Sequence, residues 1–172
     1  MPIKFHFENP NKGAWVLLRQ VHNLVSKCED HVFSEYGLTT EQHGVLMAIK
    51  HIDSPVRITD IARWLDRSVN SVSMIIDRMV KAGLVRRTRD RKDRRTVFVT
   101  ITSKAEEAYA PATLAGWELI QEILSSLSDE DKPTLIRLLE TIRDKTYDYL
   151  GSSGVVEEVR INEAENIAKL RK

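Results

Sequence analysis

Apolar residues recur at spacings of three and four over most of the chain, which is the period of an amphipathic helix. Before residue 66 this pattern predicts helices in three segments: 14–37, 41–52 and 57–65. Gly37 is a plausible stop for the first segment, because glycine tolerates the left-handed backbone beyond a helix end. Thr39 and Gln42 fit a capping box at the start of the second. Thr59 is the predicted N-cap of the third.

A fourth amphipathic segment, 68–84, begins after only two intervening residues, Asp66 and Arg67. Two helices joined by so tight a turn predict a helix-turn-helix. The predicted buried stripe of the later helix is Val69, Val72, Ile76, Met79 and Val80. Gly83 is placed for a left-handed residue after the helix, and Leu84 for the hydrophobic contact that accompanies it.

Alternating apolar and Thr positions in 96–102 predict a strand, and 84–89 is its expected antiparallel partner. Residues 90–95, "DRKDRR", have the composition of an exposed tip. A hairpin that follows a helix-turn-helix is a wing. The predicted fold class is therefore mainly α with a small β-wing, a winged helix-turn-helix flanked by helices.

Two further amphipathic helices are predicted at 102–127 and 131–150. Their apolar positions are Trp117, Ile120, Leu124, Leu127, Leu135, Leu138, Leu139, Ile142 and Tyr149. One small winged domain cannot bury all of these side chains alone. We therefore expect a homodimer, with reading heads about 34–36 Å apart for a palindromic site. An intramolecular bundle without dimerisation is the alternative.

The expected organisation has four parts: an N-terminal arm and dimerisation helix (1–36), the winged helix-turn-helix (37–102), C-terminal dimerisation helices (103–150) and an extension (151–172). The extension begins with "GSSG", which is linker chemistry. Its role stays open among a strap on the partner subunit, a cover for an effector pocket, a mobile segment and an ordinary disordered terminus.

Composition agrees with a helical, soluble protein. The chain of 172 residues is 42% hydrophobic and has seven glycines and five prolines. Because no apolar run of 18 residues and no signal-peptide core is present, we expect a cytoplasmic protein with no membrane partner. The single cysteine, Cys28, agrees with a reducing compartment. It lies on or near the apolar stripe of its helix, which predicts a buried, inert thiol.

Charge is sorted by region although the formal net charge is only +1. From Arg57 to Arg95 there are twelve Lys/Arg and five Asp/Glu, whereas the rest of the chain has fourteen and twenty. Seven basic residues fall between Arg86 and Arg95 alone. A positive region on an otherwise acidic protein favours binding of a polyanion, because neutralised phosphates release counterions. The bland alternative is a solvated charged face.

The early polar positions of segment 68–84 suit a DNA major groove. They are Ser68, Asn70, Ser71 and Ser73, with Met74 beside them. Hydroxyl and amide side chains near a helix N-terminus can donate to phosphates or read base edges. A face chosen only for solubility would be richer in Glu, Lys and Ala. The preferred partner is therefore double-stranded DNA.

The order and wording of these blocks resemble the MarR family of winged-helix transcriptional regulators. The resemblance rests on "LTTEQHGVL", "ITDIARWLDRSVNSVSMIIDRMVKAGLVRR" and "DRKDRRTVFVTIT" and covers about residues 11–150. It implies a minor-groove role for Arg95, oriented by Asp93, with Arg94 a close second. It places Asn70, Ser71, Ser73 and Met74 in the major groove.

The DNA-backbone candidates are Arg67, Arg78 and Arg86. By the resemblance, Arg78 either contacts phosphate or is braced by a carboxylate such as Asp77. A surface ion pair of little worth is the alternative interpretation of Asp77 and Arg78.

The same resemblance implies a small-molecule effector, often aromatic or phenolic and anionic, between the dimerisation helices and the winged domain. The candidate pocket residues are Trp15, His22, His43 and Trp64, although each is also a plausible packing residue. Five histidines without a compact cluster predict no metal, and no cofactor is expected.

No nucleophile elbow, phosphate-binding loop or zinc-protease motif is present, so the chain is not expected to be an enzyme. The second hypothesis is a winged helix that binds proteins and has lost specific DNA binding. The expected function is a DNA-binding regulator, most simply a homodimeric repressor of a pseudo-palindromic promoter site.

Overall fold

The computed structural model describes residues 8–89 and 96–151. Its elements are α1 (Pro10–Ser34), α2 (Thr40–His51), α3 (Ile58–Trp64), α4 (Val69–Lys81), β1 (Val85–Arg89), β2 (Val97–Ile101), α5 (Ser103–Leu124) and α6 (Asp131–Leu150). The two strands form one antiparallel sheet. The predicted fold class, mainly helical with a small β-wing, is confirmed.

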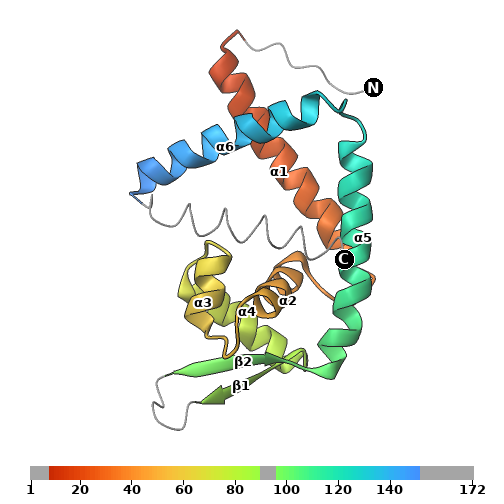
Figure 1. Cartoon of the computed structure of the whole chain (residues 1–172), viewed down its shortest axis with the longest axis vertical. Coiled ribbons are helices and arrows are strands. Elements are labelled where there is room, and N and C mark those ends of the chain that lie inside the picture. The colour runs from red at the N-terminus through yellow and green to blue at the C-terminus, as the bar shows by residue number, and fades with distance from the viewer. Residues whose placement is uncertain (1–7, 90–95, 152–172) are drawn as a thin grey trace.

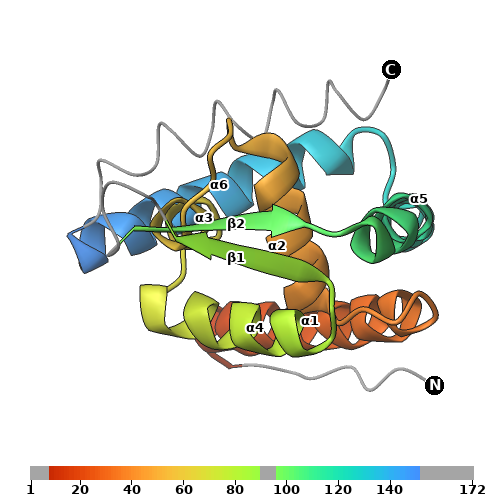
Figure 2. The same ribbon diagram turned by 90° about the horizontal axis from the view of Figure 1, so that it is seen from below.

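The chain is built in two tiers (Figure 1). The helices α2, α3 and α4 and the hairpin form the lower tier, while α1 and α6 lie above them and α5 runs upward along one side. Seen from below, α4 lies along an outer edge with the hairpin beside it (Figure 2). The buried core is centred on the lower tier and extends to α1 and α5 through Phe33 and Tyr109. A long face of α4 is therefore left at the surface.

Two helix starts show how the sequence sets the boundaries. The Thr39 hydroxyl accepts from the Gln42 amide at 3.2 Å, and the Gln42 side chain accepts from the Thr39 amide at 3.0 Å, so the predicted capping box is confirmed. The predicted cap Thr59 is wrong. Because α3 starts at Ile58, Arg57 is the N-cap, and the Asp60 carboxylate accepts from its amide at 3.1 Å.

The buried face of α4 differs in part from the predicted stripe. Val72, Ile76 and Met79 are fully buried as expected, but Val69 and Val80 are 46% and 40% exposed. The sequence reading missed Ile75, which is 1% exposed. The physical reason is that α4 packs on α2, α3 and β1, so only the face centred on Ile76 is covered. Val69 and Val80 lie at the edges of that face.

The end of α4 leads directly into the hairpin. Gly83 has φ +71°, and the Leu84 amide donates to the Met79 carbonyl at 2.9 Å, so the predicted left-handed stop is confirmed. In the hairpin Val85 pairs with Ile101 and Arg89 with Val97. The predicted strand pairing is therefore confirmed, and the hairpin leaves the core beside the C-terminal end of α4.

The predicted burial of Cys28 is wrong, while its inertness stays a prediction. The thiol is exposed, not buried. The reason is that α2 and α5 cover other sides of α1, and Cys28 does not lie on a covered side.

Candidate nucleic-acid interface

Helix α4 presents a mixed polar and apolar face opposite its buried side. Its first turn is capped by the Ser68 hydroxyl, which accepts from the Ser71 amide at 3.2 Å. Asn70 is exposed, and the Met74 side chain is 65% exposed. Ser71 and Ser73 are half-buried. Of the five predicted groove residues, Ser68, Asn70 and Met74 are thus exposed, and the Ser68 hydroxyl already serves as a cap.

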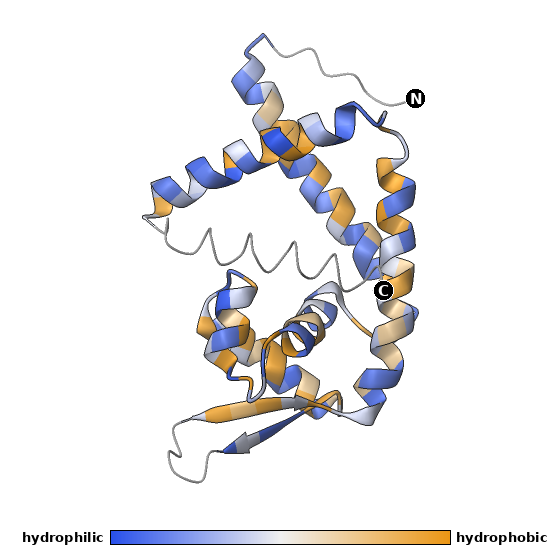
Figure 3. Ribbon diagram, viewed as in Figure 1, coloured by the Kyte–Doolittle hydropathy of each residue, from blue (hydrophilic) through white to orange (hydrophobic). Residues whose placement is uncertain are grey.

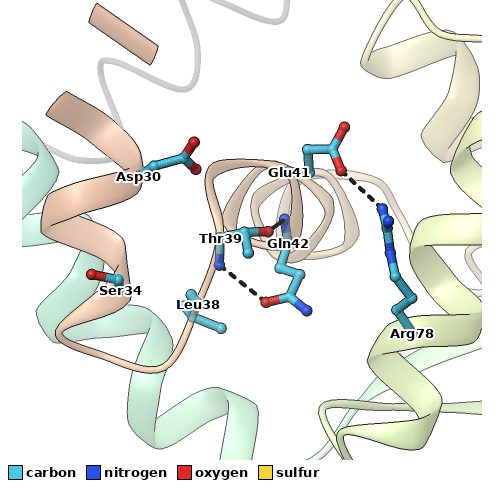
Figure 4. Close-up of a pocket in the computed structure, with 7 residues that line it drawn as sticks. All are labelled: Asp30, Ser34, Leu38, Thr39, Glu41, Gln42 and Arg78. Atoms are coloured by element: carbon cyan, nitrogen blue, oxygen red, sulfur yellow. Dashed lines mark hydrogen bonds and ion pairs between the residues drawn. The ribbon is translucent and has the colours of Figure 1, made fainter. Parts of the chain in front are cut away.

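Two of the predicted backbone-contacting arginines share one carboxylate. Glu41, in the first turn of α2, accepts from Arg67 Nη1 at 2.7 Å and from Arg78 Nη2 at 2.9 Å. Figure 4 shows the Glu41 and Arg78 side chains directed toward one another. All three side chains are partly exposed. The two guanidinium groups are therefore held at the surface beside one another, at a single carboxylate.

The carboxylate that braces Arg78 is Glu41, not the Asp77 considered from the sequence. The physical reason is that adjacent residues on a helix point in different directions and do not face each other. Asp77 instead pairs with Arg87.

Arg87 connects the hairpin to α4. Its guanidinium donates to the Asp77 carboxylate at 2.5 Å and to the Ser73 carbonyl at 3.1 Å. Because side chains alternate along a strand, the exposed Arg86 points to the other face of β1 from Arg87. The Arg87 contacts therefore fix where the hairpin emerges relative to the exposed face of α4.

The three wing-tip candidates, Asp93, Arg94 and Arg95, lie outside the described residues. Sequence reasoning missed two residues of this surface, Glu41 and Arg87. Glu41 left no sequence signal, because its partners lie 26 and 37 residues away. For Arg87 a signal existed, since strand alternation turns one of two neighbouring arginines back toward the helix.

A separate cavity of about 270 Å³ opens where α1, α2 and α5 meet. Its apolar walls include Phe33, Met47, Leu114, Trp117 and Ile120, and its polar side chains are Glu29, Thr40, His43 and Thr113. Trp117 and Ile120, which the sequence predicts for a dimer face, thus also line this cavity.

His43 forms one wall of the cavity and is 8% exposed. Its ring is stacked between Phe33 and Tyr109, with centroids 4.2 and 5.3 Å away. Burial lowers the pKa of His43 to about 4, so the imidazole is neutral at physiological pH. The Thr113 hydroxyl donates to the Tyr109 carbonyl at 2.8 Å and therefore has to accept from His43 Nε2 at 3.0 Å. The neutral His43 carries its proton on Nε2.

The other three pocket candidates lie elsewhere. Trp15 is 60% exposed and lines a shallow depression with residues of α6. Trp64 stacks on His51 in the lower tier, with centroids 6.2 Å apart. His22 is exposed on α1. The structure thus brings only His43 of the four to this cavity, and the effector pocket stays a prediction.

Among residues 8–89 and 96–151, no group of three or more His, Cys, Asp or Glu side chains is arranged to hold a metal ion. None of the helices in these ranges is both long and apolar enough to cross a membrane.

Comparison with known proteins relates this arrangement to a family of transcriptional regulators. A family model described as the MarR family matches residues 36–96. The HTH-type transcriptional regulator MgrA of Staphylococcus aureus is 33% identical over 121 residues, which cover 70% of this chain and 78% of MgrA. The uncharacterised HTH-type transcriptional regulator YfiV of Bacillus subtilis is 26% identical over 121 residues, 70% of this chain and 75% of its own.

Solved structures share the fold. The organohalide-sensing transcriptional regulator RdhR-CbdbA1625, bound to 2,4-dichlorophenol, superposes with a TM-score of 0.74 at 22% identity, covering 84% of this chain and 90% of its own. MepR of Staphylococcus aureus in complex with DNA superposes with a TM-score of 0.71 at 22% identity, covering 76% and 96%. At this identity the likeness concerns the fold.

Proposed function

Because the chain belongs to the MarR family of DNA-binding transcriptional regulators, we propose that it represses transcription as a homodimer bound to a pseudo-palindromic promoter site. In this proposal α4 enters the major groove and the hairpin reaches the adjacent minor groove. Asn70 and Met74 meet base edges, and Arg67, Arg78 and Arg86 meet phosphates. Asp93, Arg94 and Arg95 keep their proposed minor-groove role from the sequence.

The observation that carries the proposal is the combination of an open polar face on α4 with surface arginines beside it. Asn70 and Met74 are exposed on a helix whose other side is buried in the core. Arg67 and Arg78 meet at the Glu41 carboxylate beside this helix, and Arg87 holds the hairpin alongside. A helix held rigidly in this way, with its open face beside surface cations, can enter a major groove while the cations meet nearby phosphates.

Support for a homodimer comes from apolar side chains left uncovered in the upper tier. They include Val16, Leu17, Val21 and Leu24 on α1, Ile123 and Leu124 on α5, and Ile136, Leu138, Leu139 and Ile142 on α6. Figure 3 shows these helices carrying hydrophobic positions along their length. Contiguous exposed apolar surface marks an interface, and two-fold association is the commonest way to cover it.

We further propose that a small molecule in the cavity between α1, α2 and α5 alters DNA binding. RdhR-CbdbA1625 carries 2,4-dichlorophenol, and CouR of Rhodococcus jostii carries p-coumaroyl-CoA. The cavity here joins the upper tier to α2, which supports α4 through Glu41. A ligand that fits one relative position of these elements better than another would shift the population toward that position.

The proposal is tested by titrating the purified protein with random genomic DNA fragments at several salt concentrations and sequencing the bound fraction. The expected result is one enriched two-fold-symmetric site, with Asn70→Ala relaxing the sequence preference and Arg86→Ala lowering the salt slope by about one. Lys132→Ala is the charge-matched control, because Lys132 pairs with Asp129 at the start of α6, and α6 lies in the upper tier away from the hairpin (Figure 1). Binding without an enriched site would contradict the proposal, and no DNA binding would favour a protein-interaction module.

A further inference from the structure

Glu29 is a half-buried carboxylate that enters the cavity from α1. Among the residues that the structure describes, no hydrogen-bond donor or ion-pair partner reaches it. Burial and the neighbouring Asp30 raise the pKa of Glu29, while His22 acts weakly in the opposite direction. A partly desolvated carboxylate without a partner is unfavourable, and a bound cation would relieve that cost.

The other polar side chains of the cavity supply no positive charge. Within the described ranges the lining contains neither Lys nor Arg. His43 is neutral because burial lowers its pKa to about 4. The Thr113 hydroxyl is already committed to the Tyr109 carbonyl and His43. An anionic ligand would therefore sit beside a carboxylate with no cation to offset the repulsion.

The apolar walls suit a ring system. Phe33 and Trp117 are aromatic, and Met47 adds a polarisable thioether that makes favourable contacts with aromatic rings. Aromatic faces also attract a cation placed within about 6 Å of the ring centroid. The cavity volume of about 270 Å³ accommodates a two-ring compound.

We propose that the cavity binds an arylalkylamine in its protonated form, with the ammonium group at Glu29 and the rings between Phe33, Met47 and Trp117. This class of ligand has the charge opposite to that of the phenolic anions expected from the family resemblance. The proposal rests on the proposed function only in its consequence, namely that binding alters DNA affinity.

The test uses three probes that share one ring system and differ in charge: 1-naphthylmethylamine, 1-naphthylmethanol and 1-naphthoate. Each is titrated into the full chain at neutral pH by calorimetry. The amine is expected to bind about tenfold more tightly than the alcohol, and the anion more weakly than both. Equal or tighter binding of 1-naphthoate would overturn the proposal, as would the absence of saturable binding by all three.

Two variants then test whether the ammonium group of the ligand lies at Glu29. Glu29→Gln keeps the shape of the side chain and is expected to bring the amine and alcohol affinities to within about twofold of each other. Glu35→Gln removes the same charge from an exposed position at the end of α1 and should keep the amine preference. If the preference survives Glu29→Gln, the ammonium group does not lie at Glu29. The comparison of probes on the unmodified chain needs no variant to fold.

The two proposals fail separately. The same protein preparations are titrated with DNA, because none of the residues that line the cavity belongs to α4 or the hairpin. Amine binding without specific DNA binding would leave the cavity proposal standing and contradict the regulator. Specific DNA binding without a preference for the amine would support the regulator and contradict the cavity proposal.

Discussion

The hydroxyl of Tyr147, near the end of α6, donates to the Asp66 carboxylate at 3.0 Å. Asp66 lies in the turn between α3 and α4 and has φ +50°, a left-handed conformation that is uncommon for a residue with a side chain. Tyr147 is 8% exposed although most of α6 is open to solvent. The last helix of the upper tier is therefore attached to the turn that sets the start of α4.

Tyr147→Phe should lower the free energy of unfolding by about 1 kcal/mol, since it removes one hydrogen bond and leaves the ring in place. Chemical denaturation followed by circular dichroism measures the change. Tyr149→Phe is the matched control, because Tyr149 is 90% exposed on the same helix. Equal effects of the two substitutions would show that the bond to Asp66 contributes nothing. If α6 also fixes the start of α4, Tyr147→Phe alone will weaken specific DNA binding.

Glu41→Gln should strengthen binding to DNA at low salt. The substitution removes a negative charge from the proposed interface and leaves Arg67 and Arg78 free to meet phosphates. The free energy of unfolding should fall by less than about 1 kcal/mol, because these ion pairs are partly exposed. Glu106→Gln, which breaks the pair with Lys50 on another surface, serves as the control. Fluorescence anisotropy over a salt series measures both, and weaker binding by Glu41→Gln would mean that Glu41 positions the arginines productively.

The substitution Asp77→Asn distinguishes a role of Asp77 in positioning the hairpin from a purely electrostatic effect of its charge on DNA binding. On electrostatics alone, loss of a carboxylate near DNA should raise affinity. If the contact between Asp77 and Arg87 sets the position of the hairpin, the same substitution should weaken specific binding while Arg87 keeps its charge. We expect the specific site to lose more affinity than random DNA, by about tenfold. Competition titrations with the two DNAs measure the ratio, and a parallel gain for both would refute a positioning role.

The sequence was sufficient for features with local causes and insufficient for those that depend on distant neighbours. The capping box at Thr39 and the left-handed Gly83 follow from a few adjacent residues, and both are confirmed. The exposure of Val69 and of Cys28 depends on which side of a helix its neighbours cover, so periodicity alone misplaced them.

The candidate interface divides in the same way. Asn70 and Met74 were identified because helical spacing separates them from the buried stripe, and the structure leaves both exposed. The role of Glu41 could not be inferred, since its arginine partners belong to other elements. Of the proposed effector residues only His43 reaches the cavity, because a cavity is formed by three helices that no local pattern brings together.

Burial of His43 should make stability depend on pH. Its pKa of about 4 lies below the ordinary value of 6.5. Between these two values His43 is protonated in the unfolded chain and neutral in the folded chain. The free energy of unfolding should therefore fall between pH 6.5 and 4, by about 3 kcal/mol. In His43→Phe, which keeps a ring between Phe33 and Tyr109, this part of the loss should vanish. Urea titrations of both proteins across this range measure the difference, and carboxyl groups such as Asp60, which titrate in both, cancel in the comparison.

Two helical glycines should respond oppositely to alanine. A Cβ at Gly116 on α5 would lie 2.9 Å from Cε1 of Phe33, whose ring is 5% exposed and stacked on His43. Because the Phe33 ring would have to leave its stacked position on His43 to make room, Gly116→Ala should lower the free energy of unfolding by about 1–3 kcal/mol.

A Cβ at Gly44 on α2 would lie 3.6 Å from Leu65, an ordinary contact. Alanine loses less conformational freedom than glycine when a helix forms, so Gly44→Ala should raise the free energy of unfolding by up to about 1 kcal/mol. Thermal denaturation of both variants measures the signs. If Gly116→Ala were also stabilising, the Phe33 ring would have to shift easily, and the stack of Phe33, His43 and Tyr109 would then not be a rigid wall of the cavity.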